Sequence, residues 1–438
     1  MPGLSCQRQE RVAQSCSIRH SKGTAHAFGV PLPVRSTKGD SVATLQRPGS
    51  LQLAPIFLIA IPLFLWSQRE HASDTWAEDL PVYIQAVQHW LAGINPYNGS
   101  LAPLFFLYPP AFLLIAGWIS HLVPAHWGPP LYVTLVAAAV CAMPLVLARY
   151  FFRLPWLSPL LALLLFFASP RFTGIYALRT MNIASPLYCL AFIAAIPGLK
   201  SNRWRWFYLA VFLAAIVKIT FLALLLLPLL AGRRQWLWSI LCGATVALAN
   251  LGEKILWPDL YSGYTLSLKQ GILVSRVFGY GVFGLIADHR YFERGVGTAA
   301  YVTAAVLALT LTGLMFWMRL RLERAGATLQ DLTSNPVWLA LILIAIILVN
   351  PRQMQYDIDI SVFAALIVCA IVLKVQRLPT LLILMVLLFL PSLATPLILK
   401  NPRFHGVYEV FLSYAAFLLG YWRLMRETAN TPGQVSLA

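Results

Sequence analysis

The residues best suited to chemistry lie in a polar interval between two apolar blocks, residues 52–67 and 103–120. This interval holds the carboxylate of Asp79, followed by turn-forming and aromatic residues at 93–97 and 108–110. A loop that only connects two helices can be a few residues long. We therefore expect this stretch of about thirty residues to bind a ligand as well as to turn the chain.

Asp79 is the candidate general base of this loop. Sugar chemistry needs a carboxylate that takes a hydroxyl proton, and Trp76, Tyr83 and Trp90 offer aromatic faces nearby on which a sugar could stack. The simpler alternative is a solvated loop carboxylate. Glu78 is the adjacent acid, and we expect its side chain to point elsewhere. It is a candidate for a contact to the sugar or to the acceptor, and not for the base.

Two cations interrupt or end apolar blocks farther along the chain. Lys218 lies in the run Ala-Ile-Val-Lys-Ile-Thr-Phe, where a charge costs a few kcal/mol unless it is paired or reaches water. We expect two short helices to meet at Lys218 and to aim it at a lipid phosphate; a snorkelling lysine is the alternative. Arg352 has the forked donors that suit phosphate oxygens, with Tyr356 and Asp357 to hold it or to read sugar hydroxyls. An ordinary helix boundary with an internal Arg–Asp pair is equally open.

A third polar group is formed by Lys400, Arg403 and His405. Arg403 is a candidate ligand of a lipid phosphate, because a positive group on the outer face of a membrane needs an anion to hold it there. His405 is a candidate sugar or acceptor contact, although a lone histidine is more often structural.

Composition predicts an all-α polytopic membrane protein. The chain has 438 residues, of which 59% are hydrophobic and 11% charged, and its mean hydropathy is +0.71. Its apolar blocks of roughly 15–25 residues can cross a bilayer, and we expect about 11–13 transmembrane helices. The net charge of +17 fits basic loop ends facing anionic lipids. It does not indicate nucleic-acid binding, because no soluble domain is expected to carry it.

The expected organisation has three parts. Residues 1–50 are basic and rich in Ser, Gly and Pro, which predicts a disordered cytoplasmic tail. Residues 51–427 form the transmembrane domain, and residues 428–438 are a second cytoplasmic tail. The bias of basic residues toward the cytoplasm places Asp79 on the outer face of the inner (plasma) membrane. If every basic cluster faces the cytoplasm, the first half of the chain has one apolar block too many. Either the block after Tyr108 lies along the membrane surface, or Arg149 and Arg153 are exceptions to the cytoplasmic bias of basic residues.

The first loop also carries a family resemblance. The patterns Asp-Leu-x-x-Tyr from Asp79, Gly-x-x-Pro-Tyr ending at Tyr97 and Tyr-Pro-Pro from Tyr108 resemble glycosyltransferase family 87. These are GT-C-fold enzymes, typified by polyprenyl-phosphate-mannose-dependent α-1,2-mannosyltransferases. The resemblance extends diffusely over about residues 55–425 and implies that Asp79 is the catalytic base and Lys218 the mid-chain lysine. Where the family often has Gly-Gln-x-Asn, only Asn182 matches.

The resemblance implies transfer of a hexose, with mannose as the expected sugar, from a polyprenyl phosphate to a glycan or glycolipid acceptor. Tyr83, Tyr97, Tyr108 and Asn182 become candidate sugar or acceptor contacts. A single base fits direct displacement with inversion. We expect no cofactor and no metal, and the six cysteines suggest neither a metal site nor a disulfide. Two other functions are open: a lipid or solute transporter, and a polymerase or ligase of lipid-linked polysaccharide.

Overall fold

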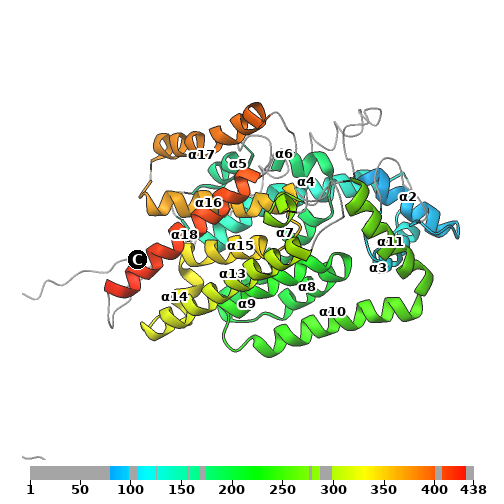
Figure 1. Cartoon of the computed structure of the whole chain (residues 1–438), viewed down its shortest axis with the longest axis horizontal. Coiled ribbons are helices and arrows are strands. Elements are labelled where there is room, and N and C mark those ends of the chain that lie inside the picture. The colour runs from blue at the N-terminus through cyan, green and yellow to red at the C-terminus, as the bar shows by residue number, and fades with distance from the viewer. Residues whose placement is uncertain are drawn as a thin grey trace, which may run out of the picture. The chain divides into compact units, whose positions relative to one another are not determined.

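The computed structural model describes residues 79–97, 106–124, 126–154, 157–167, 174–275, 279–286, 298–375, 377–399 and 407–430. Every regular element among these residues is a helix, which confirms the all-α prediction for this part of the chain (Figure 1). All of them belong to one compact unit, Gly49–Ala438. The expected tail at 1–50 and the apolar block at 52–67 lie outside the described residues.

The described helices range from 6 to 27 residues. In chain order they are α2 Leu80–Leu91, α3 Pro110–Leu122, α4 Gly128–Val146, η2 Leu147–Phe152, α5 Pro159–Phe167, α6 Gly174–Thr180, α7 Ala184–Ser201, α8 Arg205–Val217, η3 Ile219–Leu225, α9 Leu226–Ala231, α10 Trp236–Leu256, α11 Pro258–Ser275, α13 Thr298–Arg324, α14 Leu329–Ser334, α15 Pro336–Leu348, α16 Gln355–Val372, α17 Leu378–Leu399 and α18 Val407–Asn430. The interval 258–296 is polar, and its sequence predicts a second large loop; its first part is instead the helix α11.

Four of the described helices are long and apolar enough to cross a membrane: Gly128–Phe152, Ala184–Ser201, Trp236–Leu256 and Thr298–Arg324. Several further apolar helices have only 10–17 residues, among them Pro110–Leu122 and Pro336–Leu348. A single helix needs about 20 apolar residues to span the hydrocarbon core. The described chain thus has the helical, membrane-compatible character that its composition predicts, while the count of 11–13 crossings stays a prediction.

The core is built around α15, which is apolar on all sides and buried along its length from Val337 to Leu348. A helix of this kind has no polar face to turn toward water and must be covered on every side. It packs against α16 and α18. These two helices run parallel, because Ser413 Oγ donates to Ser361 Oγ at 3.0 Å and, farther along both helices, Arg423 Nη1 donates to the carbonyl of Ile371 at 2.8 Å.

The basic residues gather where several helices end. Lys200 Nζ lies 4.9 Å from the centre of the Tyr150 ring, which joins the end of α7 to η2. The side chain of Asn202 accepts from the backbone N–H of Arg233 at 3.0 Å, and Arg319 donates to the carbonyl of Leu229. We call this region the basic end. The 18 residues of α7 separate it by roughly 27 Å from the start of that helix.

The position of α3 concerns the one apolar block that is too many for the expected topology. Tyr108, just before α3, contacts Asn182, and Tyr132, in the second turn of α4, donates to the carbonyl of Met181 at 2.7 Å. The chain therefore leaves from and returns to the same place around α3, which has 13 residues. η2 then lies at the basic end. Whether α3 crosses the membrane, and on which side Arg149 and Arg153 lie, stay predictions.

Candidate functional site

A tight turn between α6 and α7 forms the centre of the candidate site. Met181 has φ of +51°, a left-handed conformation that costs a non-glycine residue of order 1–3 kcal/mol and recurs at functional sites. The next residue, Asn182, is 3% exposed, and its side-chain oxygen accepts from the N–H of Ala184 at 2.9 Å. This hydrogen bond gives the N–H of Ala184, at the start of α7, an acceptor. The amide nitrogen of Asn182 then points away from that helix.

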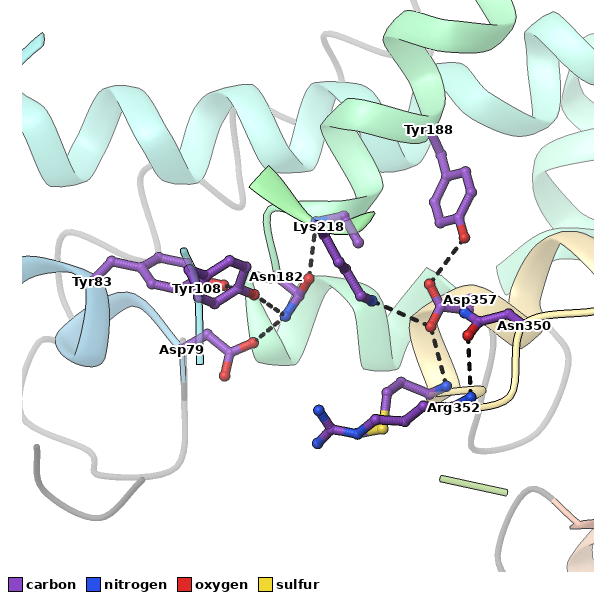
Figure 2. A network of polar contacts seen from close by, with 11 residues as sticks. Asp79, Tyr83, Tyr108, Asn182, Tyr188, Lys218, Asn350, Arg352 and Asp357 are labelled. Carbon is purple, nitrogen blue, oxygen red and sulfur yellow. Dashed lines mark hydrogen bonds and ion pairs between the residues drawn. The ribbon is translucent and has the colours of Figure 1, made fainter. Parts of the chain in front are cut away.

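Asp79 is attached to this turn by both its backbone and its side chain. Its N–H donates to the carbonyl of Thr180 at 3.1 Å, and Asn182 Nδ2 donates to its Oδ2 at 2.5 Å. Its own carbonyl accepts from the N–H of Tyr83 at 3.1 Å, which places Asp79 at the start of α2. Two segments about a hundred residues apart in sequence thus hold one half-buried carboxylate (Figure 2).

Three tyrosines surround the Asp79–Asn182 contact. The hydroxyls of Tyr83 and Tyr108 lie 2.7 Å apart, Asn182 Nδ2 donates to the Tyr108 hydroxyl at 3.2 Å, and Tyr97 donates to the Tyr108 carbonyl at 2.8 Å. Burial raises the pKa of Tyr108, and the Asp79 carboxylate raises it further, while the Arg352 guanidinium acts in the opposite direction. Burial likewise raises the pKa of Tyr83. Both hydroxyls are therefore neutral near pH 7.

Lys218 stands at the break that its sequence predicts. It has an extended backbone, with φ −152° and ψ 105°, between α8 and η3, so two short helices do meet there. Its Nζ lies 3.5 Å from Asp357 Oδ2 and 4.8 Å from the centre of the Tyr356 ring. The Lys218 side chain is 20% exposed and that of Asp357 is fully buried. The cation is thus paired and still reachable.

Asp357 is held by two further donors. The hydroxyl of Tyr188 donates to Oδ1 at 3.1 Å, and the N–H of Met354 donates to Oδ2 at 3.1 Å. The second contact satisfies the start of α16. Among the described ion pairs the partner of Asp357 is Lys218, and not Arg352 as the alternative of an internal Arg–Asp pair would require.

Arg352 lies in the turn between α15 and α16. Its N–H donates to Asn350 Oδ1 at 3.1 Å, which fixes the backbone of the turn. Its Nε is buried and has no hydrogen-bond partner among the described residues. In Figure 2 the guanidinium points away from Asp357 and toward the side on which Asp79 lies. Lys218 is within electrostatic range of both Arg352 and Asp79. The arrangement offers a carboxylate and two cations around one place.

The structure brings together most of the residues selected from the sequence: Asp79, Tyr83, Tyr97, Tyr108, Asn182, Lys218, Arg352, Tyr356 and Asp357. Glu78, Arg403 and His405 lie outside the described residues, as does Lys400. Sequence reasoning missed Tyr188 and Asn350. The available signal for Tyr188 was a hydroxyl inside an apolar run, since a buried tyrosine hydroxyl usually has a partner.

Comparison with known proteins adds no assignment to this geometry. No protein-family model matches the chain, and no curated protein matches it significantly. Within the described residues, no group of three or more His, Cys, Asp or Glu side chains is placed to hold a metal ion.

Proposed function

We propose that the chain is a polytopic membrane glycosyltransferase of the GT-C type, similar to glycosyltransferase family 87. Its donor is a polyprenyl-phosphate hexose, with mannose as the first sugar to test, and its acceptor is a glycan or glycolipid at the outer face of the plasma membrane. The observation that carries the proposal is the convergence of Asp79, Lys218 and Arg352 from three distant segments (Figure 2).

In this proposal Asp79 is the general base. The acceptor oxygen forms a bond to the anomeric carbon while the bond from that carbon to the phosphate oxygen breaks, and its electrons stay on the phosphate. The acceptor proton passes to Asp79, which requires a carboxylate held in place and unprotonated. The amide of Asn182 donates to Asp79 Oδ2 and so holds the carboxylate in place.

Lys218 and Arg352 stabilise the departing phosphate. The 3.5 Å separation of Lys218 from Asp357 is longer than the roughly 2.7–2.9 Å of a close charge-assisted hydrogen bond. The ammonium therefore keeps donors for a phosphate oxygen, and Asp357 chiefly balances its charge. Arg352 brings the buried Nε that lacks a partner within the described chain.

The test compares Asp79→Asn with Asp259→Asn, a matched change at an exposed carboxylate in the first turn of α11. Each purified full-length variant is incubated with radiolabelled polyprenyl-phosphate hexoses and membrane acceptors. We expect Asp79→Asn to bind the donor normally and to transfer sugar about 10²-fold more slowly or worse, and Asp259→Asn to remain active. Transfer at the native rate by Asp79→Asn would refute its role as base. Absence of transfer by the native chain with every donor would refute the reaction.

A further inference from the structure

The basic end contains a cavity of about 190 Å³, far along α7 from the candidate site. Its lining comes from the turn after α9, the last turns of α13 and the helix α14. The lining residues are Arg233, Arg319, Glu323, Ala327, Leu329 and Leu332. Two basic clusters that lie far apart in the sequence, one at 233–234 and one at 319–324, thus meet at a single concave surface.

Two of the three charged side chains in the cavity already have partners. Arg319 Nε lies 2.9 Å from Glu323 Oε1, and the same guanidinium also donates to the carbonyl of Leu229 near the end of α9. Arg233 uses its backbone N–H and carbonyl in hydrogen bonds to Asn202 and Gln235. None of the hydrogen bonds or ion pairs found among the described residues uses its guanidinium. Arg233 is exposed, so its guanidinium presents forked donors at the cavity that no described residue occupies.

The cavity lies where two candidate membrane spans end. α10 begins at Trp236, three residues after Arg233, and α13 ends at Arg324, next to Glu323. Exposed tryptophans stand at the same ends of these helices: Trp236 and Trp238 are 60% and 59% exposed, and Trp317 is 46% exposed. Tryptophan is enriched at the level of lipid headgroups. The apolar faces of α10 and α13 are largely open, because only 22% and 17% of an apolar 18-residue stretch of each helix is buried.

We propose that this cavity binds the phosphate headgroup of an anionic phospholipid from the cytoplasmic leaflet. Arg233 contacts the phosphate, and the acyl chains lie along the exposed apolar faces of α10 and α13. The cavity is partly open, so a phosphate can enter it while the rest of the lipid stays outside. Basic pockets at the cytoplasmic ends of transmembrane helices suit such headgroups. The site is independent of sugar transfer and shares with it only the membrane setting.

The test measures lipid binding to the full chain without any sugar donor. Native mass spectrometry from neutral detergent counts bound phosphatidylglycerol, phosphatidylcholine or inorganic phosphate on each variant. Arg233→Gln removes the charge at the cavity. Arg234→Gln is the matched control, since it makes the same change at an exposed neighbour that does not line the cavity. Arg233→Lys keeps the charge and loses the forked donors.

We expect the native chain to prefer phosphatidylglycerol over phosphatidylcholine. Arg233→Gln should lower its affinity about 10- to 100-fold, Arg233→Lys less, and Arg234→Gln hardly at all. Equal losses in Arg233→Gln and Arg234→Gln would show diffuse attraction to a basic surface and overturn the site. So would equal binding of the two lipids, or binding of inorganic phosphate as tight as that of phosphatidylglycerol. Because no transfer is measured, failure here leaves the proposed reaction untouched.

Discussion

The pair formed by Lys218 and Asp357 predicts an asymmetric response to mutation. Lys218→Met removes the charge and keeps the length of the side chain, and it leaves a fully buried carboxylate without its counter-ion. Asp357→Asn leaves the lysine unpaired instead, but the Lys218 side chain is 20% exposed and can turn toward water. The double variant has neither charge, so no charge is left without a partner.

The separation of 3.5 Å gives the size of the effect. With an effective dielectric constant of 20, two unit charges at that distance attract by about 5 kcal/mol before desolvation is subtracted. Breaking a buried pair from one side costs roughly 3–5 kcal/mol, which we expect for Lys218→Met. Asp357→Asn should cost about 1.5–3 kcal/mol, because the hydrogen bonds from Tyr188 and Met354 lose a charged acceptor. We expect the double variant to be at least about 1 kcal/mol more stable than Lys218→Met.

The assay is the free energy of unfolding of the four proteins from reversible denaturation in mixed micelles, analysed as a double-mutant cycle. Additive losses within about 0.5 kcal/mol would show that the two charges do not interact. A larger loss for Asp357→Asn than for Lys218→Met would show that the lysine, and not the aspartate, is the more deeply buried partner. Either result would refute the reasoning.

Two further predictions concern packing and pH. Gly198→Ala would push a methyl group into the Trp204 indole and should destabilise the protein by about 1–3 kcal/mol. In Gly252→Ala the added methyl group meets nothing within 4 Å, so this variant should stabilise α10 by about 0.5–1 kcal/mol. Equal melting temperatures of the two variants would contradict the packing around Gly198. Burial raises the pKa of both Tyr83 and Tyr108 above the ordinary value of 10, so their contribution to stability is complete below pH 10 and is lost as the pH rises through their folded-state values. Phenolate absorbance of either ring in the folded protein at pH 10, compared with the Tyr→Phe variants, would contradict this.

The sequence was most informative where a residue conflicts with its surroundings. A charge inside an apolar run predicts a break in the helix, and Lys218 does lie between two short helices. Asp79 was selected from the polarity and aromatic content of its loop and, above all, from the resemblance of that loop to glycosyltransferase family 87. In contrast, the partners of both residues depend on tertiary contacts across more than a hundred positions, as for Asp79 with Asn182 and Lys218 with Asp357. No local periodicity encodes such pairings.

The limits of hydropathy appear in the fold as well. The block after Tyr108 is as apolar as a membrane span, yet α3 has 13 residues and the chain returns to the same place after it. The polar interval at 258–296 is read from sequence as a loop, whereas its first part is the helix α11. Hydropathy along the chain therefore predicts neither the length of a helix nor the place where the chain turns back.

The pairing of Lys218 with Asp357 also constrains the order in which the protein can be completed. The lysine is synthesised well before its counter-ion, which follows only after α10, α13 and α15 have been made. In a membrane setting, the segment from α8 to α9 would wait meanwhile with an uncompensated charge, at a cost of a few kcal/mol. Stable insertion of that segment is therefore expected to be delayed until α16 leaves the ribosome. Chains truncated before Asp357 should therefore leave Lys218 more reactive toward amine-directed reagents than it is in the finished protein, where its side chain is paired and 20% exposed.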